Sequence, residues 1–264
     1  MKFKLHYRVY MVLALVAASC GGGGNDAADG GTEEPAADVS AGGSTADEAI
    51  PEAPEMVYAS HILIPFEGCT QAPPDAMERD SAFELLSSVA DSIEKGLLTF
   101  EEAAGKYSSC PSSRQGGFLG GFQKGQMVPE FEDVVFNMPE GTFSDVFETE
   151  YGFHVVYREP AIRVSHILIA WQGAERSTVA RSREEALELV ESIRDSLSSG
   201  TLTFAEAAEK YSDCPSGMNG GDLGPFSRHV MTPAFEDAAF DLEVGETSGI
   251  VETPFGYHLI RRTE

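Results

Sequence analysis

The chain has 264 residues, of which 42% are hydrophobic and 23% charged, so it can bury a sizeable core and is not disordered throughout. Its 43 acidic residues against 18 Lys and Arg give a formal net charge of −25, which argues against a sequence-independent grip on nucleic acid. Four cysteines are too few for a disulfide scaffold, and no two have the C-x-x-C spacing of a metal or redox motif.

The first twenty residues have the features of an export signal. Basic residues precede a short apolar run, Val9 to Ala18, which has the length of a signal-peptide core and is too short to span a bilayer. Small residues then lead to Cys20, and this arrangement resembles a bacterial lipoprotein signal, which implies that Cys20 is lipidated and becomes the mature N-terminus. We therefore predict a signal peptide over residues 1–19. Ordinary secretion with cleavage nearby is the alternative.

The segment that follows, residues 20–55, is rich in Gly, Ala and Pro, with nine acidic residues and no Lys or Arg. Such a composition cannot bury a core, so we predict a disordered acidic tether. Gly22, and not Asp, lies after Cys20, and this resembles the lipoprotein signals that direct a protein to the outer membrane. The expected location is the periplasmic side of a bacterial outer membrane, with the lipid at Cys20 as anchor; the outer face of a Gram-positive membrane is the alternative. A plain disordered tail without lipid is the alternative.

An internal repeat governs the rest of the chain. Matching segments lie 104 or 105 residues apart, and they are residues 59–64 with 164–169, 99–104 with 203–208, 106–111 with 210–215, 131–133 with 235–237, and 152–154 with 256–258. A period this long indicates a duplicated domain, not a solenoid. We place the two domains at residues 56–160, the first repeat, and 161–264, the second repeat.

The second repeat gives the clearer pattern of elements. Capping boxes at Ser182 with Glu185 and at Thr203 with Glu206 predict the starts of two helices, and Thr99 with Glu102 predicts the same in the first repeat. In chain order we expect a strand at 164–170, the two helices, a strand at 222–226, a short helix at 233–240 and a strand at 257–262. This order predicts an α+β fold with a small antiparallel sheet in each repeat.

Two histidines occupy matching places in each repeat, one on the opening strand and one on the closing strand: His61 and His154, then His166 and His258. Strands from opposite chain ends often pair in small α+β domains, so each histidine pair is expected to meet. A structural, hydrogen-bonded role is the alternative. Cys110 and Cys214 follow the second helix of each repeat, and a thiol near imidazole also allows a Cys/His nucleophile, although nothing local identifies a cysteine peptidase.

Large apolar residues recur in the glycine-rich middle of each repeat. They are Leu119, Phe122, Met127 and Phe131 in the first repeat, and Leu223, Phe226, Met231 and Phe235 in the second. Core packing is the simplest interpretation of such a set. Their position on loops and at a helix start instead favours a binding site, because loops run over surfaces and often carry function.

Together these motifs resemble the parvulin family of peptidyl-prolyl cis/trans isomerases, over both repeats. The resemblance implies a hydrogen-bonded cluster beneath a proline pocket. The cluster would be His166, Cys214, Thr253 and His258 in the second repeat and His61, Cys110, Thr149 and His154 in the first. The recurring apolar residues would line the pocket. The resemblance also implies that the partners are unfolded exported chains with Xaa-Pro bonds. No set of residues in the sequence suggests a metal or organic cofactor.

Phe118 stands where the second repeat has Asp222, so we expect the second repeat to be the better isomerase. A phosphate-binding loop would need clustered Arg or Lys after the first strand. The first repeat has only Arg79 there, and we interpret Arg176, Arg181 and Arg183 in the second repeat as a solvated face near the helix start, so we do not expect phosphorylated substrates. The alternative from another class is a non-catalytic chaperone that holds unfolded exported chains in the same apolar grooves. Paired histidines discriminate between the two, because a pure binder has no use for them.

Overall fold

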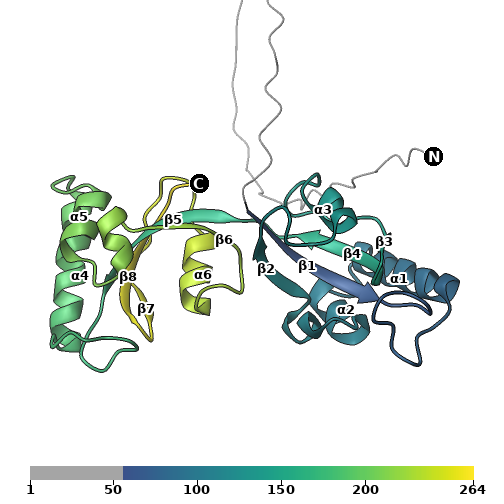
Figure 1. Ribbon diagram of the computed structural model, residues 1–264. Helices are drawn as coiled ribbons and strands as arrows, with labels where there is room; N and C mark the ends of the chain where they lie inside the picture. Colours follow the sequence, from purple (N-terminus) through teal and green to yellow (C-terminus); the bar gives the residue numbers. More distant parts are fainter. Residues whose placement is uncertain (1–55) are drawn as a thin grey trace, which may run out of the picture. The chain divides into compact units, whose positions relative to one another are not determined.

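The computed structural model describes residues 56–264, and the predicted signal peptide, tether and lipidation site at Cys20 lie outside them. Each repeat forms its own four-stranded antiparallel sheet with helices, which confirms the predicted α+β fold (Figure 1). Within these described residues, no helix has both the length and the apolar character needed to cross a membrane.

The elements of the two repeats follow one another in the same order. The first repeat contains β1 (Val57–Ile64), α1 (Arg79–Glu94), α2 (Phe100–Tyr107), the 3₁₀ helix η1 (Pro111–Gln115), β2 (Phe118–Phe122), α3 (Pro129–Val135), β3 (Phe147–Thr149) and β4 (Gly152–Arg158). The second contains β5 (Ile162–Ile169), α4 (Arg183–Ser198), α5 (Phe204–Tyr211), η2 (Pro215–Asn219), β6 (Asp222–Phe226), α6 (Pro233–Phe240), β7 (Val251–Thr253) and β8 (Gly256–Arg262). All elements predicted for the second repeat are confirmed, whereas β7, η2 and their counterparts were not predicted.

The predicted capping boxes are confirmed. Ser182 Oγ accepts from the backbone N–H of Glu185 at 3.1 Å, and the Glu185 carboxylate accepts from the N–H of Ser182 at 2.7 Å. Thr203 with Glu206, and Thr99 with Glu102, form the same reciprocal pair. Two of the N–H groups that a helix start leaves free are thereby satisfied in each case, so these three helix starts are encoded locally.

The strand order is β2-β1-β4-β3 in the first sheet and β6-β5-β8-β7 in the second. The first and last strands of each repeat are therefore neighbours at the centre of the sheet. In the second sheet, Leu168 faces His258 and His166 faces Ile260 across the β5–β8 pair. This register brings residues 92 positions apart in the sequence to adjacent places.

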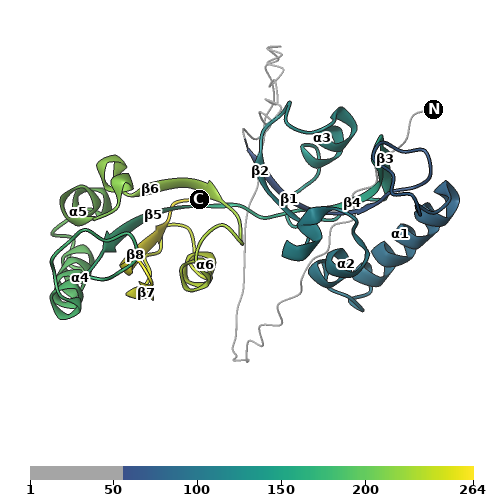
Figure 2. The same cartoon turned by 60° about the horizontal axis from the view of Figure 1, so that its bottom comes forward.

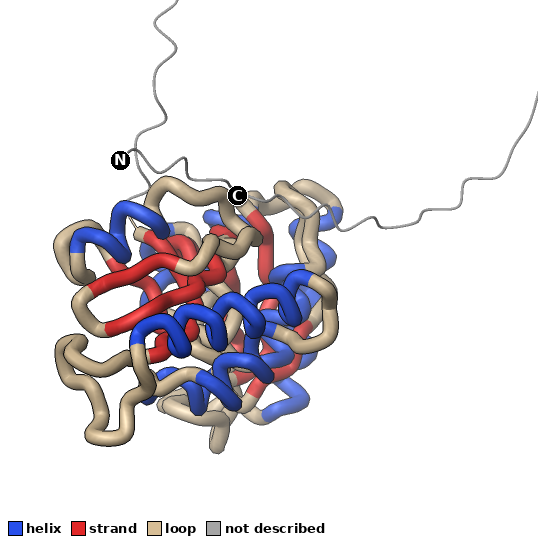
Figure 3. Tube along the Cα trace, turned by 90° about the vertical axis from the view of Figure 1, so that its right-hand side faces the viewer, coloured by secondary structure: helices blue, strands red, loops and turns tan. Residues whose placement is uncertain are grey.

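Alternation along the central strands divides each repeat into two cores. Ile167 and Ile169 of β5 pack against α4 and α5, whereas Ile162 and Val164 pack on the opposite face under α6. His166 follows in the second series, so it lies on the α6 face. The first repeat is built alike, and Figure 2 shows α3 on one side of its strands and α1 and α2 on the other. The helix layer in front of the strands is also visible in Figure 3.

Candidate active site

The two histidines of each repeat lie side by side on one face of the sheet. Nδ1 of His166 is 3.3 Å from Nδ1 of His258, and the corresponding distance between His61 and His154 is also 3.3 Å. Their side chains are buried, since the four residues are only 4–6% exposed. Diagonal neighbours on adjacent strands account for this contact, because His166 faces the residue two positions after His258.

In the second repeat the pair belongs to a longer chain of hydrogen bonds, which we call the relay. The relay runs through Thr253, His258, His166, Ser216 and Cys214. Nε2 of His258 is 2.8 Å from Thr253 Oγ1, Nε2 of His166 is 3.1 Å from Ser216 Oγ, and Ser216 Oγ donates to Cys214 Sγ at 3.2 Å. Thr253 Oγ1 also accepts from the backbone N–H of Phe255 at 3.1 Å.

The donor from Ser216 to Cys214 is compatible with one set of tautomers through the relay. With Ser216 Oγ donating to Cys214, its oxygen accepts from Nε2–H of His166. Neutral His166 then accepts at Nδ1 from Nδ1–H of His258, and Nε2 of His258 accepts from the Thr253 hydroxyl. We adopt this assignment, in which the relay runs from Thr253 to Cys214.

The first repeat contains only half of this chain. Thr149 Oγ1 lies 2.8 Å from Nε2 of His154, which contacts His61 as described. Beyond that point, within residues 56–264, His61 Nε2 has no hydrogen-bond partner, and neither does the buried hydroxyl of Ser112. The Cys110 thiol likewise makes no hydrogen bond within the described chain. The structure thus brings Thr149, His154 and His61 together but leaves Cys110 outside their network.

Burial keeps all four histidines neutral near pH 7. Desolvation lowers the pKa of His166 and of His61 from 6.5 to about 4. Desolvation, and then the neighbouring histidine, lower the pKa of His258 and of His154 to about 3. The floor of each site is consequently polar but carries no charge.

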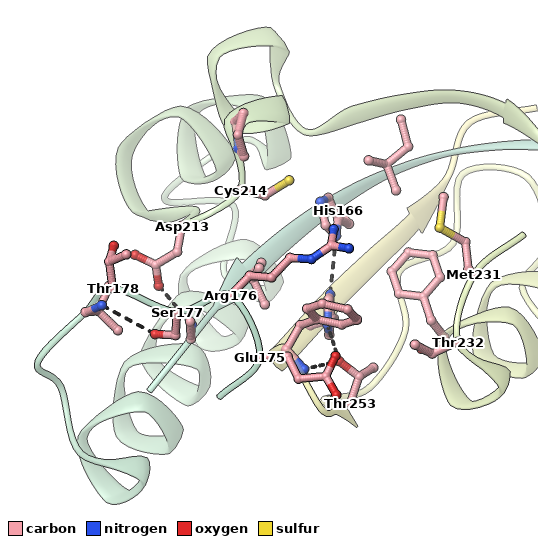
Figure 4. Close-up of a pocket in the computed structure, with 18 of the residues that line it drawn as sticks. His166, Glu175, Arg176, Ser177, Thr178, Asp213, Cys214, Met231, Thr232 and Thr253 are labelled. Atoms are coloured by element: carbon pink, nitrogen blue, oxygen red, sulfur yellow. Dashed lines mark hydrogen bonds between the residues drawn. The ribbon is translucent and has the colours of Figure 1, made fainter. Parts of the chain in front are cut away.

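A pocket of about 770 Å³ opens above the relay in the second repeat. His166, Cys214, Thr253 and His258 all line it, together with the predicted apolar residues Leu223, Met231 and Phe235. Figure 4 shows Cys214 and Met231 on opposite sides of His166. Phe235 stands edge-on to both imidazoles, with ring centroids 5.7 Å from His166 and 5.3 Å from His258. Glu175, Arg176 and Asp213 also line the pocket, so Arg176 is not simply part of a solvated face (Figure 4). The pocket therefore combines an apolar wall and a neutral, hydrogen-bonded floor with charged side chains.

The structure places Phe226 outside this pocket. Its side chain is 2% exposed and packs behind Phe235, with ring centroids 6.2 Å apart. Phe226 therefore belongs to the core under α6. Phe122 is buried in the same way in the first repeat, 3% exposed and 6.1 Å from Phe131. Both were predicted to line a pocket; Phe226 is not among the lining residues, and both side chains belong to the cores under α6 and α3.

The remaining apolar residues of the first repeat take corresponding positions. Phe131 lies edge-on to His61 and His154, at 5.8 and 5.6 Å, while Leu119 and Met127 are partly buried against the same cluster. One difference is Phe147, which stacks on His154 at 5.4 Å where the second repeat has Val251 opposite His258. The first site is more aromatic than the second.

Asp222, whose replacement by Phe118 was expected to weaken the first repeat, does not line the pocket. Its carboxylate binds the Arg163 guanidinium on the neighbouring strand, with contacts of 2.8 and 3.1 Å. Sequence reasoning instead missed Ser216, which closes the relay. A signal for it exists, because Cys-Pro-Ser recurs as residues 110–112 and 214–216.

A small antiparallel sheet with a buried histidine pair under a Met- and Phe-lined pocket defines a prolyl isomerase of the parvulin type. Comparisons with known proteins agree. The family model described as the PPIC-type PPIASE domain, a rotamase, matches residues 61–160 and again residues 166–264. The chain therefore belongs to the PPIC-type peptidyl-prolyl cis/trans isomerase family, is an enzyme of that class, and contains two such domains in tandem.

Individual relatives are similar over one or both repeats. The chain is 43% identical over 112 residues to the peptidyl-prolyl cis-trans isomerase Pin1 of Malus domestica, covering 39% of this chain and 93% of that protein. It is 31% identical over 215 residues to the chaperone SurA of Methylobacillus flagellatus, covering 78% of this chain and 47% of that protein. The solved structure of peptidyl-prolyl isomerase ESS1 from Candida albicans matches with 39% identity and a TM-score of 0.39, over 39% of this chain and 63% of that one.

Proposed function

We propose that the second repeat catalyses rotation about Xaa-Pro bonds in the pocket above the relay. In this proposal Leu223, Met231 and Phe235 hold the proline ring, while the relay sets the polarity beneath the amide. The observation that carries it is a pair of buried, neutral imidazoles that line a pocket with an apolar wall.

The chemistry of the reaction explains why such a site is suitable. Partial double-bond character gives the Xaa-Pro bond a barrier of about 18–20 kcal/mol, and no covalent bond has to break. Water and cations stabilise the planar amide, because its resonance places negative charge on the carbonyl oxygen. Neutral imidazoles beneath the amide withhold that stabilisation, while the twisted amide, which has lost the resonance, needs it least.

In this mechanism Cys214 acts as a hydrogen-bond acceptor and not as a nucleophile. Its thiol ends the relay by accepting from Ser216, so it holds the tautomer of His166 in place. Cys214→Ser, which can still accept that bond, should retain most of the activity. Covalent acyl-enzyme formation by the wild type, together with complete loss of turnover after alkylation with one equivalent of a thiol reagent, would instead support nucleophilic catalysis.

We propose the same activity at a lower rate for the first repeat. His61, His154 and Thr149 repeat the arrangement, but the chain of hydrogen bonds stops at His61. Nothing then selects the tautomer of His61 from its outer side. Phe131, Met127 and Leu119 would hold the proline ring.

We further propose that the protein assists the folding of exported polypeptides and is anchored by a lipid at Cys20. The predicted signal peptide (residues 1–19) and acidic tether (20–55) support this, as does the similarity to a protein named chaperone SurA. The expected site is the periplasmic side of an outer membrane. Replacing Cys20 by Ser should release the protein from the membrane fraction, and retention there would contradict lipid anchoring.

The decisive experiment measures prolyl isomerisation of Ala-Xaa-Pro-Phe peptides by residues 21–264. The variant Met231→Ala/Phe235→Ala should lose most of the acceleration, and the matched variant Met127→Ala/Phe131→Ala should lose only the smaller contribution of the first repeat. No acceleration by the wild type, with suppression of client aggregation intact, would mean that this chain uses the fold only to bind unfolded clients.

A further inference from the structure

A buried carboxylate next to the pocket has no part in the relay. Glu236 lies in the first turn of α6, one residue after the pocket residue Phe235, and is only 7% exposed. Burying a carboxylate is costly unless the charge is paired or hydrogen-bonded. Within residues 56–264, no Lys or Arg forms an ion pair with Glu236.

Its partners are two backbone N–H groups of the loop that carries the pocket methionine. One oxygen, Oε1, accepts from the N–H of Val230 at 2.8 Å and from the N–H of Met231 at 2.7 Å. Hydrogen bonds to a charged acceptor are about twice as strong as neutral ones. The carboxylate therefore holds the backbone of Met231 at a fixed distance from α6, the helix that presents Phe235.

The loop needs such a restraint. His229, immediately before Val230, has φ of +71°, a left-handed conformation that residues with a Cβ rarely adopt. In the first repeat the corresponding residue is Gly125, with φ of +90°, which adopts this conformation without strain. A non-glycine residue remains there only because the surrounding contacts, including those of Glu236, define the turn.

The same restraint exists in the first repeat. Glu132 Oε1 accepts from the N–H of Gly125 at 2.7 Å and from the N–H of Met127 at 2.9 Å. The methionine N–H is therefore held in both repeats, although the rest of the loop differs in sequence. Because the hydrogen bond from the methionine N–H to the glutamate occurs in both repeats, we do not interpret it as an incidental contact.

We propose that Glu236, and Glu132 in the first repeat, are positioning residues that set the methionine wall of the proline pocket. This inference rests on the proposed function of that pocket. A proline ring held by Met231 is gripped in the planar and the twisted state alike, so a loosened methionine weakens both states equally. The expected signature is a rise in KM with kcat unchanged.

The test uses the full mature chain, with the first-repeat pocket disabled by Met127→Ala/Phe131→Ala in every sample. Glu236→Ala should raise KM about tenfold with kcat within about twofold of the parent. Glu236→Gln keeps an acceptor oxygen for both N–H groups and should restore most of the lost affinity. The matched control is Asp237→Ala, because Asp237 is the next residue on the same helix, 73% exposed and paired with Arg228.

A second readout does not depend on turnover. The methyl resonance of Met231 in ¹³C-methionine NMR should shift or broaden in Glu236→Ala and stay unchanged in Asp237→Ala. Unaltered kinetics and an unaltered Met231 signal in Glu236→Ala would overturn the inference, as would a fall in kcat at constant KM, which reports only a smaller folded fraction. A parent protein without isomerase activity, in which Glu236→Ala still moves the Met231 signal, would refute the proposed function while supporting the positioning role.

Discussion

Ser216 and Ser112 occupy corresponding places in the two repeats but differ in their contacts. Replacing each by alanine is therefore expected to change the stability of its repeat differently. Ser216→Ala removes the hydrogen-bond partner of His166 Nε2 and leaves that buried nitrogen unpaired. Leaving a buried donor or acceptor unsatisfied costs about 1–3 kcal/mol. Ser112→Ala removes a buried hydroxyl that has no partner, so it should cost nothing or stabilise the first repeat slightly.

Native-state hydrogen exchange measures both repeats in one intact chain, because the central strands report the unfolding of each sheet separately. Amides of β5 and β8 should lose about 1–3 kcal/mol of protection in Ser216→Ala, and those of β1 and β4 should keep theirs in Ser112→Ala. Isomerisation by the second repeat should fall as well, to the level of the first repeat. Equal losses of protection from the two substitutions would refute the idea that the relay is closed in one repeat and open in the other.

Three further outcomes are expected. Between pH 6.5 and about 4 the unfolded chain takes up protons on His61 and His166, while the folded chain does not. The free energy of unfolding should therefore fall on acidification by about 1.4 kcal/mol per histidine per pH unit. A free energy of unfolding in urea that is unchanged from pH 7 to pH 5 would contradict the burial of neutral imidazoles. Phe226→Ala should cost about 3–5 kcal/mol of stability with KM unchanged, whereas Leu223→Ala should chiefly raise KM. A raised KM in Phe226→Ala would show that Phe226 lines the pocket after all. Asp222→Phe, which introduces the residue of the first repeat, should leave kcat/KM unchanged. It should lower the free energy of unfolding by less than about 1 kcal/mol, since the ion pair of Asp222 with Arg163 is more than a third exposed. A clear loss of turnover would show that this ion pair influences the active site.

Local signals account for the parts of the fold that the sequence predicts well. Ser182 with Glu185 encodes a helix start within four residues, and the helix begins there. The duplication also provides two sequences from which each element can be predicted. β7 was missed because three residues, Val251–Thr253, are too short to show an alternating pattern, and its pairing with β8 is a tertiary effect.

The site is harder to predict because its contacts depend on side-chain direction. The histidines are on strands, so their meeting follows from sheet topology. Ser216 reaches His166 across 50 residues of sequence, and the same Cys-Pro-Ser segment makes no such bond in the first repeat. Phe226 and Phe235 are both aromatic, and only the geometry of β6 and α6 determines which faces the pocket. The roles of these residues in turnover remain predictions.

The strand order has a consequence for how the protein is made. In each repeat the last strand in sequence, β4 or β8, lies between two strands that precede it. Until that strand is made, β3 or β7 has no partner and β1 or β5 is paired on one side only. His61 can contact His154 only after that residue, 93 positions later, has been synthesised. A partly synthesised repeat consequently has neither a complete sheet nor a histidine pair, and such long-range pairing folds slowly. An enzyme that accelerates a slow step in the folding of proline-containing chains thus completes its own site only at the end of its own folding.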